Sequence, residues 1–103
     1  MNELSGKVIL VTGGTRRIGA SIVRHLHDHG ATLVVHYNAS SVDAHTLSSE
    51  LNSIRDKSLI LLQGNLKDIA SINNPLRKII NQCGRLDALV NNASRFYPTP
   101  ISS

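Results

Sequence analysis

The chain has 103 residues, 41% of them hydrophobic, and a formal net charge of +4. This length suits one domain, and no apolar run approaches the roughly 20 residues that span a membrane. The only tight basic cluster is Arg16-Arg17, inside a glycine-rich turn, so nucleic-acid binding is not expected as a main function. One cysteine excludes an internal disulfide and, with the polar first residues, favours a cytoplasmic protein.

The first predicted elements are a strand over residues 7–12, a glycine-rich turn and a helix over residues 17–29. Val8–Val11 is an unbroken apolar run, as in a parallel strand that is covered on both faces. After the turn the apolar residues recur at helical spacing, at Ile18, Ile22 and Leu26. A helix that begins at a glycine-rich turn offers free N–H groups to an anion, which in a βαβ unit is usually a dinucleotide pyrophosphate.

A second strand is predicted over Thr32–Tyr37, and the residues after it bear on the choice of cofactor. NAD-binding folds place an acidic residue about 20 residues past the turn, against the ribose hydroxyls. No acidic residue lies between Asp28 and Asp43. Arg16 and Ser40 can instead donate hydrogen bonds to a 2′-phosphate, which favours NADPH over NADH. The alternative is an exposed Arg16 and a Ser40 that only caps the next helix.

The rest of the chain continues the alternation of helices and strands. A helix begins at Ser40 or Ser41 and ends near Arg55, with Val42, Leu47, Leu51 and Ile54 directed inward. A buried strand follows over residues 58–63. A helical region over residues 69–83 carries an apolar stripe, but Pro75 predicts that it restarts there after a short first turn. A fourth strand is predicted over residues 86–91.

This order predicts a Rossmann-type doubly wound parallel α/β sheet with strand order 3-2-1-4. Ligands bind such sheets at the switch point, beyond the carboxyl ends of the first and fourth strands. The Gly13–Gly19 turn and the Asn91–Phe96 segment both lie at that edge. His25 and His29 are four residues apart, but a solvated helix face explains them better than a metal site, and no metal is expected.

Two motifs resemble the short-chain dehydrogenase/reductase family. Residues 12–19 read T-G-x-x-x-R-x-G, similar to the family's T-G-x-x-x-G-x-G turn, with Arg17 in place of the middle glycine. Residues 91–100 read N-N-A-S-R-F-Y-P-T-P, where the wider family usually has N-N-A-G. Both departures resemble the pteridine reductases, and the resemblance covers nearly the whole chain.

The resemblance implies an NADPH-dependent reductase of a pterin or dihydropterin. In that family, the loop after the third strand carries an Asp that receives the adenine amino group, and this chain has Asn65 there. The implied substrate residues are Arg17, Ser94 and Phe96, whose ring can stack on a flat heterocycle. The implied cofactor residues are Gly13, Arg16, Arg17, Ile18, Gly19, His36, Asn38, Ser40, Asn65, Leu66, Asn92, Ala93 and Ser94.

The family's catalytic Tyr, with a Lys four residues later, has no counterpart here. Tyr37 is followed four places on by Ser41, and Tyr97 by Ile101. We therefore expect residues 1–103 to be the N-terminal, cofactor-binding part of one Rossmann domain, inactive alone. Two alternatives stay open: another short-chain reductase of carbonyl or enoyl substrates, and a non-catalytic dinucleotide-binding module. The apolar fourth strand at the sheet edge also predicts a homo-oligomer.

Overall fold

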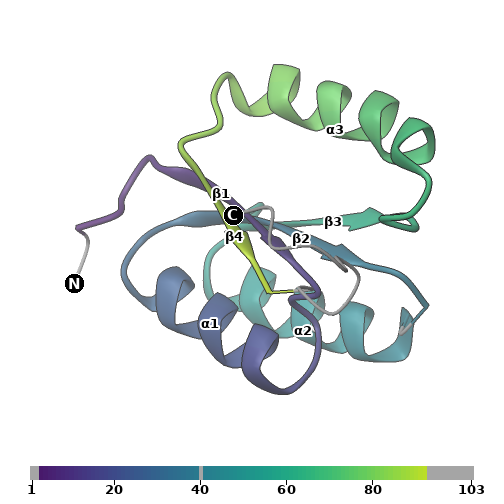
Figure 1. Ribbon diagram of the computed structural model, residues 1–103. Coiled ribbons are helices and arrows are strands. Elements are labelled where there is room, and N and C mark those ends of the chain that lie inside the picture. Colours follow the sequence, from purple (N-terminus) through teal and green to yellow (C-terminus); the bar gives the residue numbers. More distant parts are fainter. Residues whose placement is uncertain (1–2, 40, 93–103) are drawn as a thin grey trace.

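The computed structural model describes residues 3–39 and 41–92, and these form a four-stranded parallel sheet between two layers of helices (Figure 1). Helices α1 and α2 cover one face of the sheet, and α3 covers the other. The elements in chain order are β1 (Val8–Thr12), α1 (Arg17–Asp28), β2 (Thr32–Tyr37), α2 (Ser41–Ile54), β3 (Leu59–Gln63), α3 (Ile69–Cys83) and β4 (Ala88–Asn91).

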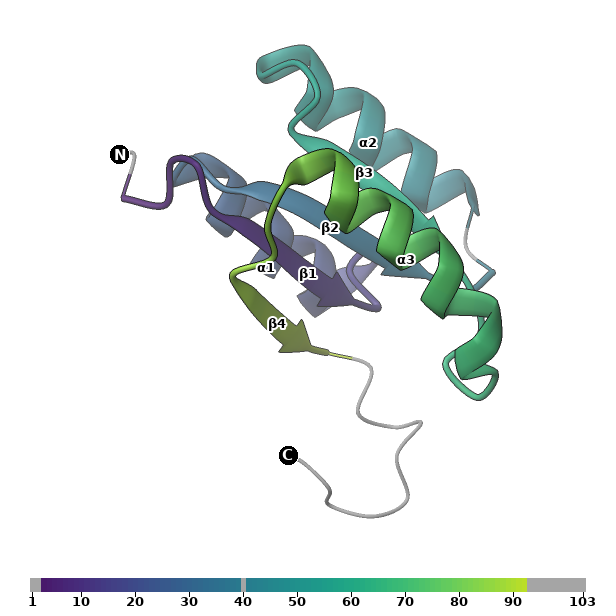
Figure 2. The same ribbon diagram turned by 90° about the horizontal axis from the view of Figure 1, so that it is seen from above.

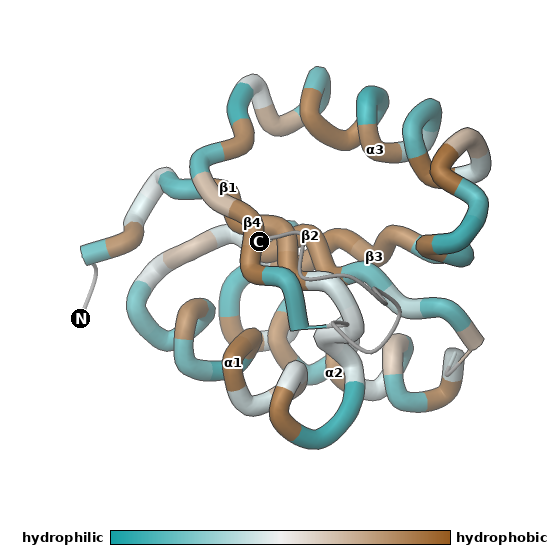
Figure 3. The backbone as a smooth tube through the Cα atoms, viewed as in Figure 1, coloured by the Kyte–Doolittle hydropathy of each residue, from teal (hydrophilic) through white to brown (hydrophobic). Residues whose placement is uncertain are grey.

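The strands lie in the order β3-β2-β1-β4, which confirms the predicted Rossmann-type topology. Successive side chains of a strand point to opposite faces, so β1, β2 and β3 each contribute to two cores. Figure 3 shows the strands as largely hydrophobic stretches of the chain. Ile9 and Val11 of β1 pack towards α1 and α2. Val8 and Leu10 pack on the other face, with Ile72 and Ile79 of α3. This two-sided burial is why the strands read as continuous apolar runs.

Helix α3 is continuous, so the predicted restart at Pro75 is wrong. Pro75 lies inside the helix and is exposed, as is Ser71 one turn before it. A proline has no N–H to donate to the carbonyl one turn earlier, but at this exposed position water can satisfy that carbonyl. The Ser71 side chain donates to the Asp68 carbonyl at 2.8 Å and supports the first turn.

Two side chains of α2 that the sequence analysis directed inward are exposed. Val42 and Ile54 are 79% and 68% exposed, whereas Leu47 and Leu51 are buried as predicted. Val42 lies about 140° around the helix from Leu47, so Ala44 takes the inward position instead. Ile54 is the last residue of the helix, where the packing against the sheet has ended. Ile18, in the first turn of α1, is also 70% exposed.

Within residues 3–39 and 41–92, strand β4 pairs only with β1 and lies at the edge of the sheet (Figure 2). It begins at Ala88, two residues later than predicted, because Asp87 bonds to Val8 through its side chain as well as its backbone and so ends the regular strand pairing. The Asp87 carboxylate accepts the Val8 N–H at 2.8 Å, and the Asp87 N–H donates to the Val8 carbonyl at 2.8 Å. Arg85 pairs with the same carboxylate and helps to hold the pKa of Asp87 below its ordinary value. Leu89 of β4 is 59% exposed.

Candidate functional site

The candidate site lies where the topology of the sheet reverses, at the carboxyl ends of β1 and β4. The register sets Thr12 beside Asn91, so the turn after β1 and the segment after β4 start from the same point. The Thr12 hydroxyl donates to the Asn91 side-chain oxygen at 3.0 Å and accepts the Asn92 N–H at 3.0 Å. The two motifs that are separated in the sequence therefore meet in one place.

Gly13, the first glycine of the turn, is held from both sides. Its N–H donates to Nδ1 of His36 in β2 at 3.1 Å. Its carbonyl accepts a hydrogen bond from the Asn92 side-chain amide at 3.0 Å. The backbone φ of Gly13 is +61°, which glycine adopts without the steric cost that other residues meet. The turn is thus fixed before any ligand arrives.

Gly19 allows the closest approach between helix α1 and this turn. A Cβ added at Gly19 would lie 2.1 Å from the Gly13 carbonyl oxygen and 2.7 Å from the Asn92 side-chain nitrogen. No side chain fits there without moving the backbone. The start of α1 therefore packs directly on the turn, which places the first helical N–H groups beside the space that an anion would occupy.

Two arginines flank this space, and both are exposed. Arg16 precedes α1, and its Nε lies 3.3 Å from a carboxylate oxygen of Asp43 in α2. Arg17 is the first residue of α1 and has a φ of +49°, in the left-handed region. It therefore adopts, at the position of the family's middle glycine, a backbone conformation that suits glycine. At a residue with a side chain this conformation costs free energy.

The end of β2 contributes a buried histidine and an exposed asparagine. His36 is 2% exposed, and its Nε2 lies 2.8 Å from the carbonyl oxygen of Gly64, after β3. Asn38 is exposed, and its carbonyl accepts a hydrogen bond from Gln63 at 3.2 Å. The predicted contacts of both residues with a cofactor stay predictions, but the His36 ring itself is already occupied by the protein.

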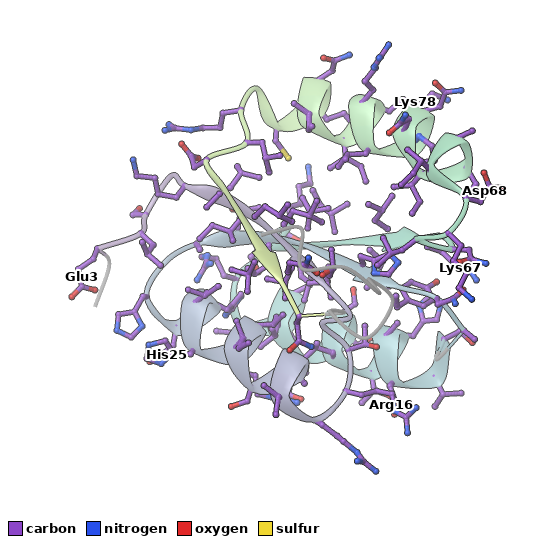
Figure 4. The ribbon with its side chains drawn as sticks, in the orientation of Figure 1. Glu3, Arg16, His25, Lys67, Asp68 and Lys78 are labelled. Carbon is purple, nitrogen blue, oxygen red and sulfur yellow. The ribbon has the colours of Figure 1, made fainter. Side chains whose placement is uncertain are left out.

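The loop after β3 lies at the same end of the sheet. Asn65 is exposed, and its side-chain oxygen accepts the Lys67 N–H at 2.9 Å, while Leu66 is half-buried. A second lone pair on that oxygen is still able to accept an adenine amino group. Figure 4 shows Arg16, Lys67 and Asp68 towards one end of the molecule and Glu3 and His25 towards the other. Ser40, Ala93, Ser94 and Phe96 lie outside the described residues.

The bridging role of the His36 ring and the pairing of Arg16 with Asp43 were missed by the sequence analysis. Both depend on distances across the fold, because His36 and Gly13 are 23 residues apart. No pattern along the sequence signals either contact. Among the described residues, no group of three or more His, Cys, Asp or Glu side chains is placed to hold a metal ion.

Within residues 3–39 and 41–92, no helix is both long and apolar enough to cross a membrane. The fold and the site define a Rossmann-type domain with a glycine-rich turn at its switch point. The short chain dehydrogenase family matches the chain over residues 7–103, and the chain belongs to that family.

The curated relatives include pteridine reductase 1 of Leishmania tarentolae, 39% identical over 91% of this chain and 38% of the relative. The 3-oxoacyl-[acyl-carrier-protein] reductase FabG of Vibrio harveyi is 40% identical over 88% of this chain and 35% of the relative. A solved short chain dehydrogenase of Burkholderia cenocepacia, in complex with NADP, superposes with a TM-score of 0.79 at 33% identity. That alignment covers 87% of this chain and 36% of the other. The chain thus spans less than two-fifths of the length of these relatives.

Proposed function

We propose that this chain is the N-terminal, NADPH-binding part of a short-chain reductase that acts on a pterin or dihydropterin. The observation that carries the proposal is the meeting of the Gly13–Gly19 turn with Asn91 and Asn92 at the switch point. The turn is already fixed, and the lack of a side chain at Gly19 lets the start of α1 pack directly on it. These features fit a dinucleotide pyrophosphate, whose oxygens would accept from the N–H groups at the start of α1.

The preference for NADPH is supported by charge. Arg16 and Arg17 flank the turn, and the strand end that carries an acidic residue in NAD-binding folds carries His36 and Asn38 here. A 2′-phosphate beside Arg16 would meet a cation and no neighbouring carboxylate on β2. When bound, NADPH supplies the hydride, and this part of the protein binds and orients it.

Calorimetric titration of the chain with each cofactor tests the binding step. We expect NADPH to bind at least about tenfold more tightly than NADH, as one charge-assisted hydrogen bond provides. Equal dissociation constants would remove the basis for NADPH specificity. If neither NADPH nor NADH binds, the proposed function as a whole is overturned.

The assignment of a pterin substrate is supported by Arg17 and by the similarity to pteridine reductase 1 of Leishmania tarentolae. The proposed residues are Arg17, Ser94 and Phe96, with the Phe96 ring stacked on the flat heterocycle. In the full-length protein, Phe96→Ala should raise the apparent Michaelis constant for dihydrobiopterin and leave NADPH affinity nearly unchanged. Reduction of simple ketones but not of pterins would favour a carbonyl or enoyl reductase, a second candidate to which the Vibrio harveyi relative points.

Arg17→Gly separates the ligand role of Arg17 from its backbone cost. Glycine has no steric penalty at a φ of +49°, so the free energy of unfolding should rise by about 0.5–1 kcal/mol. The same change removes the cation from the mouth of the site and should weaken NADPH binding several-fold. Chemical denaturation and calorimetry measure the two effects on one variant.

Lys57→Gly is the matched control, because Lys57 has a φ of +57° in a loop between α2 and β3. It should stabilise the fold similarly and leave cofactor affinity unchanged. A loss of affinity in the control equal to that in Arg17→Gly would show that the effect at Arg17 is not local to the site.

Homo-oligomer formation and a cytoplasmic location also stay proposals. The exposed Leu86 and Leu89 beside the edge of β4 support the first, and the single cysteine, Cys83, supports the second. A stable monomer on gel filtration would count against an oligomer, and recovery of the protein in a membrane or secreted fraction would count against the location.

A further inference from the structure

The His36 ring joins two loops that are far apart in the sequence. Nδ1 lies 3.1 Å from the Gly13 backbone nitrogen, in the turn after β1. Nε2 lies 2.8 Å from the Gly64 carbonyl oxygen, at the start of the loop after β3. The side chain is 2% exposed, so water does not replace either contact. A single buried imidazole therefore connects the pyrophosphate side of the proposed site with its adenine side.

The two partners determine where the ring carries its proton. The Gly13 N–H is only a donor, so Nδ1 must be the unprotonated acceptor. The Gly64 carbonyl is only an acceptor, so Nε2 must carry the hydrogen. This is one tautomer of the neutral ring. A second proton on Nδ1 would face the Gly13 N–H, and the contact would change from a hydrogen bond to a repulsion between two donors.

The charged groups around the ring are few. His36 follows Val34 with the alternation of β2, so it lies on the α3 face of the sheet. Strands β1, β3 and β4 contain no ionisable side chain. In the loop after β3 and in α3, which pack against this face, the ionisable residues are Lys67, Asp68, Arg77, Lys78 and Cys83, while the neighbouring Tyr37 points to the opposite face. The hydrogen bonds of the ring go to Gly13 and Gly64 and not to these side chains, and the four charged ones are exposed.

We infer that His36 is a positioning residue for the dinucleotide, and that its neutral ring sets the glycine turn so that cofactor affinity falls when the ring is protonated. The inference rests on the proposed cofactor site. It gives His36 a role through the Gly13 backbone, in addition to any contact with the cofactor. It also makes binding depend on pH through a ring whose two nitrogens are both held by the protein backbone.

Burial is the main cause that lowers the pKa of His36 from its ordinary value near 6.5, and the hydrogen bond to Gly64 opposes it. The folded protein thus binds this proton less readily than the unfolded chain does. The contribution of the neutral ring is complete above about pH 6.5 and is lost as the pH falls towards the lowered pKa. Cofactor binding by the folded protein should weaken at lower pH, as the pH falls through that lowered pKa and the folded ring takes up its second proton.

Two variants test the two hydrogen bonds of the His36 ring separately, because each can replace only one of them. In His36→Asn, the side-chain oxygen takes the place of Nδ1 and can accept the Gly13 N–H, but it cannot titrate. In His36→Gln, the amide nitrogen takes the place of Nε2 and can donate to Gly64, which leaves the Gly13 N–H without its acceptor. The matched control is His27→Gln. His27 is also buried, with a pKa lowered mainly by burial, but its Nε2 contacts Ser58 at the opposite end of the sheet.

The measurement is the dissociation constant of NADP⁺ between pH 5 and pH 8, on protein whose folding is checked by circular dichroism at each pH. At pH 8, His36→Gln should bind about tenfold more weakly than the unmodified chain, whereas His36→Asn should stay within about threefold. The unmodified chain and His27→Gln should lose affinity as the pH falls, and His36→Asn should lose less. Titration of the 2′-phosphate is common to all four proteins and cancels in the comparison.

An identical pH dependence in His36→Asn and the unmodified chain would overturn the inference while leaving the proposed function intact. Absence of NADP⁺ binding by the unmodified chain at every pH would overturn the proposed function itself. If the His36 variants do not fold, NMR of the unmodified chain decides. The Gly13 amide resonance should titrate together with the His36 ring nitrogens, and a Gly13 resonance that ignores that titration would contradict the inference.

Discussion

Replacing Gly19 with alanine should abolish dinucleotide binding and destabilise the domain by about 3 kcal/mol, the upper part of the range for overpacked sites. The added Cβ would lie 2.1 Å from the Gly13 carbonyl oxygen and 2.8 Å from the Gly14 Cα. Both are backbone atoms, so the clash is relieved only by moving α1 away from the turn. Calorimetry with NADPH and thermal unfolding measure the two losses.

Gly84→Ala is the control for this change. Gly84 ends α3 with a φ of +82°, and a Cβ there would meet no atom within 4 Å. It should cost about 1 kcal/mol through backbone conformation alone and should leave NADPH affinity unchanged. If Gly19→Ala behaved like this control, the pyrophosphate would have to lie elsewhere.

Reversing the charge at Arg16 should change the cofactor preference. Arg16→Glu places a carboxylate where the 2′-phosphate is proposed to bind, and we expect NADPH affinity to fall about 10- to 100-fold. NADH has no phosphate there, so its affinity should change little. The new carboxylate would also face Asp43, the present partner of Arg16, which should turn the side chain outward and limit the loss of stability.

Arg24→Glu is a control with the same change in net charge. Arg24 lies on α1 and, like Arg16, pairs with an acidic residue of α2, in this case Glu50, but it is two turns further from the glycine turn. The control should leave the ratio of NADPH to NADH affinities unchanged. An equal effect of both variants would attribute the preference to net charge, and the assignment of Arg16 to the phosphate would fail.

The elements could be predicted because their signals are local. The apolar run before Gly13 and the helical spacing after Gly19 lie within one βαβ unit, and the handedness of such units then determines the strand order. Gly30 follows the C-terminal end of α1 with a φ of +103°, a conformation that suits glycine. Exposure at the helix ends was harder to predict, because Val42 and Ile18 are apolar in the sequence whichever way they point.

The interior of the site could be predicted only in part. The family resemblance placed His36 at the cofactor, but its ring is buried between two backbone groups that the sequence does not bring together. Asn92 was expected to contact the cofactor, and the structure shows its amide on the Gly13 carbonyl. Pair distances of this kind arise from tertiary packing, and no pattern along the chain encodes them directly.

The order in which the chain is synthesised has a consequence for this site. The Gly13 carbonyl is held by Asn92, which is 79 residues later in the sequence. A nascent chain can pair β1 with β2 early, but it cannot complete the glycine turn until β4 has docked beside β1. Because closing so long a loop is slow, the cradle for the dinucleotide is among the last parts to form. Competence to bind a dinucleotide therefore marks a chain whose four strands have all been assembled.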